Sequence, residues 1–120
     1  MSHTENLSTL VIQIQPDLLP AYDEAAILAA CEGLKVHKPL IASFRLEEGE
    51  DDGRWVNLSF ETAEPARVWP LLQAAFYGDG PLGEALRAAS MAVCTGEEGW
   101  DDYLLLYHFD PDQILDSLEG

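Results

Sequence analysis

Positive charge is scarce in this sequence. The 120 residues include 6 Lys and Arg against 22 Asp and Glu, which gives a formal net charge of −16 at pH 7. Binding to a nucleic acid backbone or to an anionic membrane surface relies on Lys and Arg side chains. We therefore expect neither a nucleic acid nor a membrane as a partner, and the charge favours a basic protein instead.

Cysteines are few, and targeting segments and long apolar runs are missing. Cys31 and Cys94 are too few for a disulfide framework, and their apolar surroundings predict two reduced core residues. No run approaches the roughly 20 apolar residues of a transmembrane helix. Residues 1–8 lack the basic and apolar regions of a signal peptide, so the sequence predicts a cytoplasmic protein.

The sequence also lacks a recognisable catalytic or metal-binding motif. Residues 78–83 match Gly-x-Gly-x-x-Gly by letter, but they follow a predicted helix and are interpreted as a turn between helices. Residues 48–53 resemble part of a calcium loop, yet Ser59 stands where the bidentate Glu is required. His108 has only Asp110 nearby and is interpreted as a half-buried strand residue. We predict no enzyme activity, no catalytic residues, no metal and no cofactor.

The strongest structural signal is a predicted hairpin over residues 39–61. Apolar residues occupy every second position on both strands, which is the period of a half-buried antiparallel pair. The alternating set is Leu40, Ala42, Phe44, Leu46, Val56, Leu58 and Phe60. Residues 47–53 between the strands hold five carboxylates and two glycines, and they predict an acidic turn.

Strand and helix periods alternate along the rest of the chain. Further strands are predicted over residues 7–15, 91–95 and 103–109, and helices are predicted to begin near Pro20, Thr62, Pro81 and Asp110. Residues 103–109 are apolar on both faces, which indicates a central position in the sheet. Pro70 should either kink the second helix or move its start to near Trp69.

This order of elements contains the βαββαβ arrangement of ferredoxin-like folds. We therefore predict an α+β protein with a ferredoxin-like split βαβ antiparallel sheet and helices on one face. An extra C-terminal strand and a short helix would extend it. A single domain over residues 1–120 is expected, with residues 1–6 as a loose leader. This architecture carries many unrelated activities, so it does not fix the function.

Two acidic segments bordered by aromatic residues form the candidate partner-binding site. One is the predicted hairpin turn, and the other covers residues 96–102. Tryptophan is favoured as an interface anchor, and carboxylates steer association with a basic partner. The candidate residues are Glu47, Glu48, Glu50, Asp51, Asp52, Trp55, Glu97, Glu98, Trp100, Asp101 and Asp102. The alternative is that both segments are solvated turns whose tryptophans cover the rim of the core.

The sequence favours an acidic, non-catalytic protein that inhibits a basic partner protein. The leading interpretation is an immunity protein that occludes the active site of a bacterial toxin. The alternative is a small ferredoxin-like regulatory or ligand-binding module with an apolar cleft between sheet and helices. Two further hypotheses are a homodimer through residues 103–109 and an enzyme that uses a carboxylate or His108.

Overall fold

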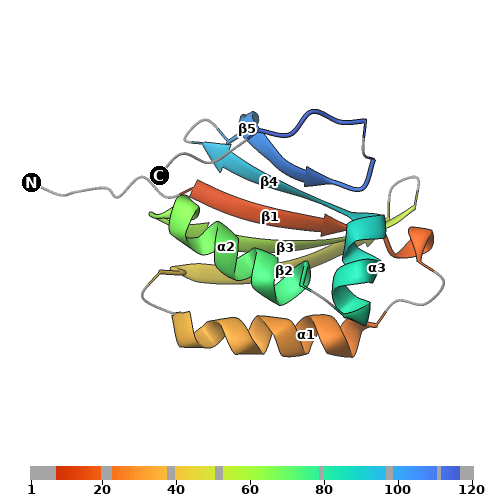
Figure 1. Cartoon of the computed structure of the whole chain (residues 1–120). Coiled ribbons are helices and arrows are strands. Elements are labelled where there is room, and N and C mark those ends of the chain that lie inside the picture. Colours follow the sequence, from red (N-terminus) through yellow and green to blue (C-terminus); the bar gives the residue numbers. More distant parts are fainter. Residues whose placement is uncertain are drawn as a thin grey trace, which may run out of the picture.

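A five-stranded antiparallel sheet carries helices on one face (Figure 1). The computed structural model describes residues 8–19, 23–37, 40–50, 53–78, 80–96, 99–110 and 112–116. The strands are β1 (Ser8–Ile14), β2 (Ser43–Glu50), β3 (Arg54–Thr62), β4 (Ser90–Gly96) and β5 (Gly99–His108). The helices are α1 (Glu24–Gly33), α2 (Pro65–Phe76) and α3 (Pro81–Ala89), with 3-10 turns η1 (Pro16–Leu18) and η2 (Leu34–His37). The predicted α+β class is confirmed.

Strand β1 occupies the centre of the sheet, whose order is β2-β3-β1-β4-β5. It pairs with β3 from Ser8 opposite Thr62 to Ile14 opposite Val56, and with β4 on its other side. The strands that α1 links, β1 and β2, therefore have β3 between them. The strands that α2 and α3 link, β3 and β4, have β1 between them.

The hydrophobic core lies between the sheet and the helices. Alternate residues of the three inner strands point to the helices and are buried: Leu10, Ile12, Ile14, Val56, Leu58, Phe60, Ala92 and Cys94. The helices contribute Ile27, Leu34, Val68, Leu72, Phe76 and Leu86. Burial of each large side chain stabilises the fold by about 1.5–3 kcal/mol. This layer is therefore the main source of stability.

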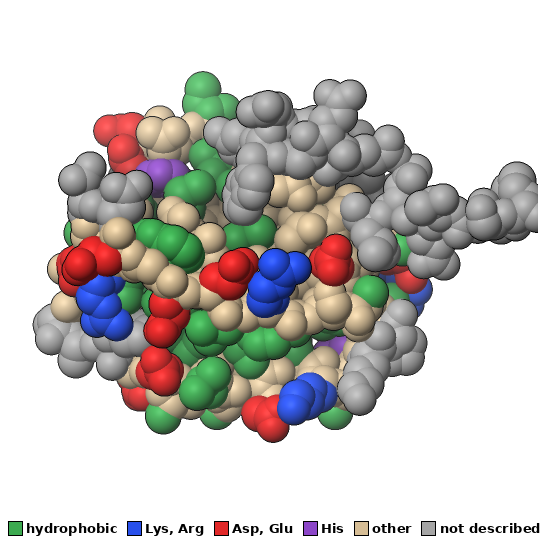
Figure 2. Space-filling view, turned by 180° about the vertical axis from the view of Figure 1, so that it is seen from behind, with side chains coloured by type: hydrophobic (Ala, Val, Ile, Leu, Met, Phe, Trp, Pro, Cys, Tyr) green, Lys and Arg blue, Asp and Glu red, His purple; other side chains and the backbone are tan. Residues whose placement is uncertain are grey.

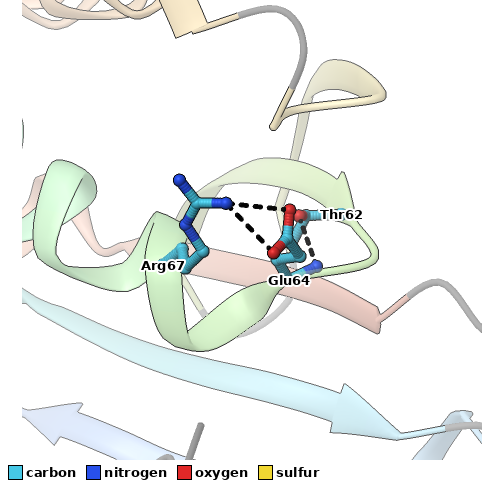
Figure 3. A network of polar contacts seen from close by, with 3 residues as sticks. All are labelled: Thr62, Glu64 and Arg67. Carbon is cyan, nitrogen blue, oxygen red and sulfur yellow. Dashed lines mark hydrogen bonds and ion pairs between the residues drawn. The ribbon is translucent and has the colours of Figure 1, made fainter.

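A side-chain cap fixes where α1 begins, whereas α2 begins without one. The Asp23 carboxylate accepts a hydrogen bond from the N–H of Ala26 at 3.0 Å. At α2, Thr62 Oγ1 accepts from the N–H of Glu64 at 2.9 Å, and the Glu64 carboxylate lies 3.2 Å from Arg67 (Figure 3). The N-cap residue is Glu64, so the prediction placed the cap two residues early. Thr62 instead ends β3 and binds the connecting backbone.

Helix α2 runs continuously through its internal proline. It begins at Pro65, so the alternative start near Trp69 is wrong. Pro70 is exposed and lacks the N–H that would otherwise bond to the carbonyl of Ala66. Because Val68 and Leu72 on either side are fully buried, core packing holds the helix together across the missing bond.

Strand β5 lies at an edge of the sheet, so the predicted central position of residues 103–109 is wrong. The register with β4 shifts between Ala92 and Val93 and skips Leu106, which is buried in the core. Leu104 is 38% exposed. The Tyr107 hydroxyl donates to the carbonyl of Arg87. The apolar character of β5 therefore serves contacts with the helix layer at the edge, not burial on both faces.

The chain itself covers the outer edge of β5. Asp110 Oδ1 accepts from the N–H of Asp112 and closes a turn, after which the chain runs back beside β5 (Figure 1). The N–H of Asp116 donates to the carbonyl of Leu105 at 2.7 Å, and Asp116 Oδ2 accepts from the N–H of Leu105 at 2.8 Å. The predicted final helix is therefore wrong for the described residues up to Asp116.

Gly49 of β2 lies beneath the indole ring of Trp55, its partner across the hairpin. A Cβ atom at position 49 would overlap the ring atoms of Trp55. The absence of a side chain therefore allows the ring to lie flat across β2. At Gly33, the last residue of α1, a Cβ atom would meet no neighbouring atom within 4 Å.

The substitution Gly49→Ala should lower the free energy of unfolding by about 1–3 kcal/mol, because the added methyl displaces the indole ring. The matched control Gly33→Ala should leave stability unchanged or raise it by up to about 1 kcal/mol, since alanine favours the helix. Urea unfolding followed by circular dichroism measures both. Equal stability of the two variants would contradict the packing of Trp55 on Gly49.

Candidate functional site: the groove between α1 and β2

A groove of about 750 Å³ lies between α1 and the start of β2. Its apolar lining consists of Leu28, Cys31, Leu34, Ile41, Phe44 and Phe60. We call it the α1–β2 groove. Clefts of this size and composition are typical of binding sites for small molecules or for side chains of a partner.

The groove exists because α1 and β2 lie at the border of the core. Ile27 of α1 and Leu34 of η2 are buried in the core, while Leu28 of α1 is 43% exposed. Phe44 packs on Phe60 with ring centroids 5.0 Å apart, yet it is also 43% exposed because no described strand follows β2 in the sheet. The alternating pattern correctly placed Phe44 on the apolar face of the hairpin, which is the face toward the helices. Sequence reasoning missed Leu28, which lies outside the helical i, i+3, i+4 set.

Charged and polar side chains form the rim of the groove. Lys35 and Glu32 form an exposed ion pair at 2.5 Å on the α1 side. Ser43 also borders the groove, but its hydroxyl donates to Glu61 Oε1 at 2.5 Å on the face of the sheet away from the helices. Exposed pairs of this kind add little stability, so they are available for exchange with a partner. The groove thus combines an apolar floor with a polar rim.

Cys31 lines the groove as a free, half-buried thiol. Burial, with a smaller effect from the neighbouring Glu32 carboxylate, raises the pKa of Cys31 to about 11. The thiol is therefore protonated at neutral pH and is a poor nucleophile. Cys94 is also free and is buried in the core, where desolvation raises its pKa. The prediction of two reduced cysteines is confirmed, although Cys31 lies at the groove.

The first acidic segment is mostly strand rather than turn. Because β2 extends to Glu50, opposite Arg54, three of its predicted site residues lie on a pleated edge strand. All three are exposed: Glu47, Glu48 and Glu50. Side chains alternate along a strand, so Glu47 lies on the face away from the helices while Glu48 and Glu50 continue the face of Phe44. Asp51 and Asp52 lie outside the described residues.

Trp55 has a structural role on the face away from the groove. Its ring covers Gly49, and its side chain is half-buried. It borders a second hollow of about 440 Å³, where the carboxylate of Asp17 accepts from the N–H of Arg54 at 3.0 Å. Trp55 therefore covers the end of the sheet and does not point into the α1–β2 groove.

The second acidic segment lies at the opposite end of the sheet. The β2–β3 turn is next to Ile14, whereas β4 approaches the β4–β5 turn at Thr95, opposite Thr9 (Figure 1). Five strand residues separate these ends, which is about 17 Å. Glu97 and Glu98 lie outside the described residues. The backbone of Trp100, Asp101 and Asp102 belongs to β5, and their side chains are outside the described part. The two acidic segments therefore lie on separate surfaces.

The remaining sequence motifs have structural explanations. Gly78 and Gly80 lie between α2 and α3, as the predicted inter-helix turn requires, while Pro81 to Gly83 form the first residues of α3. His108 is half-buried in β5, as predicted, and its Nδ1 accepts from the N–H of Asp110 at 2.9 Å. Within the described ranges, no three His, Cys, Asp or Glu side chains are grouped as metal ligands would be.

The face of the sheet away from the helices is shown in Figure 2. Acidic and basic side chains form a row across it, and hydrophobic side chains are exposed in a band below that row. Strand β2 contributes Arg45 and Glu47 to this face, with a weak ion pair of 3.8 Å. An apolar band next to exposed charges is a feature of many binding surfaces.

Comparison of the chain with protein families, curated proteins and solved structures gives no match. In the part of the chain that is described, every helix is too short or too polar to cross a membrane.

Alkylation of Cys31 by iodoacetamide should keep accelerating between pH 8 and pH 10, because its pKa of about 11 leaves little thiolate at neutral pH. The rate of an ordinary thiol levels off near pH 9. Mass spectrometry of timed samples measures the alkylation rate of Cys31. The variant Cys31→Ala is the control, because any alkylation that remains in it comes from the buried Cys94. The raised pKa also implies that the free energy of unfolding falls as the pH rises from about 9 to 11, because the thiol ionises at a lower pH in the unfolded chain than in the folded protein. A rate that levels off near pH 9, as for an ordinary thiol, would contradict the burial of Cys31.

Proposed function

We propose that this protein is a non-catalytic, acidic binding protein that inhibits a basic partner protein. The observation that carries the proposal is the position of three exposed carboxylates, those of Glu47, Glu48 and Glu50, on the strand that borders the apolar α1–β2 groove. Apolar pockets supply the affinity of an interface, and surrounding charges steer association and select the partner. The net charge of −16 favours a basic partner over an acidic one.

A bacterial toxin is the partner class that we propose, with the protein acting as its immunity protein in the cytoplasm. Inhibition would follow from occlusion, because Lys and Arg residues around a polyanion-binding active site would pair with carboxylates of β2. We also propose that β1 to β4 with their helices form a ferredoxin-like unit. The strand order β2-β3-β1-β4 supports this, since each pair of helix-linked strands is separated by one strand.

Reversal of the β2 carboxylates should abolish partner binding. The triple variant Glu47→Lys, Glu48→Lys, Glu50→Lys should fail to retain the basic protein that the unmodified chain captures from a lysate of its source organism at low salt. These side chains are exposed, so the circular dichroism spectrum should not change. Quantitative mass spectrometry of the retained proteins makes the measurement.

A matched control separates a specific surface from general acidity. Glu24, Glu84 and Asp112 are exposed and lie on α1, α3 and the C-terminal segment. Their reversal to Lys changes the net charge by the same amount and should leave capture intact. Equal loss in both triple variants, or unchanged capture by the β2 variant, would show that this surface is not the binding site.

A second candidate function is the binding of a small apolar ligand. The volume and the apolar floor of the α1–β2 groove favour it, since ligand pockets measure about 300–1,000 Å³. An uncharged aliphatic ligand such as decanol would then bind with little dependence on salt. Calorimetric titration with decanol at low and high salt distinguishes this function from recognition of a basic protein.

A further inference from the structure

We propose that the basic partner binds as an added strand: an extended segment pairs with the outer edge of β2 and inserts apolar side chains into the α1–β2 groove. The proposal rests on the proposed function and specifies how the partner is recognised. It also defines the chemistry of the segment, which carries apolar side chains at one end and Lys or Arg at the other.

The outer edge of β2 is the first observation. Among the described strands, β3 is the only neighbour of β2 in the sheet. In an antiparallel edge strand, every second residue directs its backbone N–H and C=O away from the sheet, where another strand can pair with them. At the opposite edge, Asp116 already binds both backbone groups of Leu105. The two edges therefore differ at Leu105, and among the described residues the outer edge of β2 has no such contact with another segment of the chain.

The side chains of β2 define what the added strand must carry. On the face toward the helices, Phe44 and Leu46 come first and Glu48 and Glu50 follow. A strand beside β2 would place its side chains on the same face next to these residues. Its apolar side chains would lie beside Phe44 and enter the groove, which Leu28 closes on the α1 side. Its basic side chains would lie beside the two carboxylates.

A second copy of this chain fits the same edge poorly. Two-fold antiparallel pairing of two β2 strands around Glu47, with helices on the same side, would place Glu50 opposite Phe44 and Glu48 opposite Leu46. It would also place Glu47 opposite its own copy. Apolar side chains would then face carboxylates, and like charges would meet at the centre. Each copy also carries a net charge of −16, which opposes association.

A synthetic peptide tests the proposal with the intact protein. The peptide Lys-Thr-Lys-Lys-Val-Thr-Leu-Thr places two Lys, Val and Leu on one face when it pairs antiparallel to β2. The control Lys-Leu-Thr-Lys-Val-Thr-Lys-Thr has the same composition and charge, but its apolar side chains point to opposite faces. We expect the first peptide to bind at least about fivefold more tightly in an NMR titration. Equal affinities would overturn the proposal.

The variant Leu28→Glu separates the groove from simple charge attraction. It adds a carboxylate, so attraction of a basic peptide by charge alone would stay equal or increase. Insertion of apolar side chains predicts instead a loss of affinity of about tenfold. Ile114→Glu is the control. Ile114 is 89% exposed on the C-terminal segment, away from the groove, so this substitution should leave the affinity unchanged. Unchanged or increased affinity in Leu28→Glu would overturn the proposal.

Backbone pairing has its own readout. On saturation with the first peptide, hydrogen exchange should slow at every second amide of residues 43–50, the pattern of a strand paired on a new edge. Protection confined to α1, or sedimentation of the free protein as a dimer whose β2 amides are already protected, would overturn strand addition.

The proposed function and the binding mode can fail separately. If capture of the natural partner is lost on reversal of the β2 carboxylates but survives Leu28→Glu, the proposed function stands and strand addition is wrong. If the peptide binds as an added strand but no basic partner is captured, the binding mode stands and the proposed function is wrong.

Discussion

Strand β1 forms backbone hydrogen bonds with β3 on one side and with β4 on the other, and this double pairing sets the rest of the architecture. Its alternate residues Leu10, Ile12 and Ile14 are buried at the centre of the helix-covered face. The hairpin β2–β3 attaches on one side and the hairpin β4–β5 on the other. Because β3 and β4 both run antiparallel to β1, and one turn precedes β3 while the other follows β4, the two turns lie at opposite ends of the sheet. A single constraint therefore separates the two acidic segments.

The same constraint decides which strands are edges, and the two edges have different surroundings. Strand β5 contributes Leu106 to the core and is bordered outside by the returning chain at Asp116. Strand β2 is an edge of the described sheet, Phe44 is 43% exposed, and α1 forms the far wall of a groove beside it. Unpaired edges favour uncontrolled association, and the exposed carboxylates of β2 oppose it. The charges thus make an open edge tolerable, and in the proposed binding mode they also select a basic strand.

Much of the fold could be predicted because its signals are local. Alternation in residues 39–61 and the prolines that open α2 and α3 correctly indicated a hairpin and two helices. The edge position of β5 could not be predicted, because it depends on a register shift against β4 and on contacts of Tyr107 with the helix layer. A run such as residues 103–109 has the same apolar composition whether it lies at the centre or at the edge of a sheet, so its composition does not distinguish the two positions.

The candidate site was predicted less well, for a similar reason. Composition located the carboxylates of residues 47–53, but cross-strand pairing of Glu50 with Arg54 decides where the strand ends and which face each carboxylate takes. The groove depends on the position of α1 relative to β2. The two elements are connected through η2, and their relative position is set by packing in the folded protein, not by a local sequence signal. Leu28 has no sequence signal that distinguishes it from any apolar residue on a helix.

The central position of β1 also affects how the chain folds during synthesis. Ile14 pairs with Val56 and with Ser90, so the strand that leaves the ribosome before the others has to wait for two partners that are made much later. Such long-range pairing slows folding, and it leaves an apolar strand with one bare edge until β4 is made. Mutual repulsion among the many carboxylates keeps neighbouring nascent chains apart during this interval. The acidity that we propose attracts a basic partner to the folded protein would thus also lower the risk of aggregation before β4 joins the sheet.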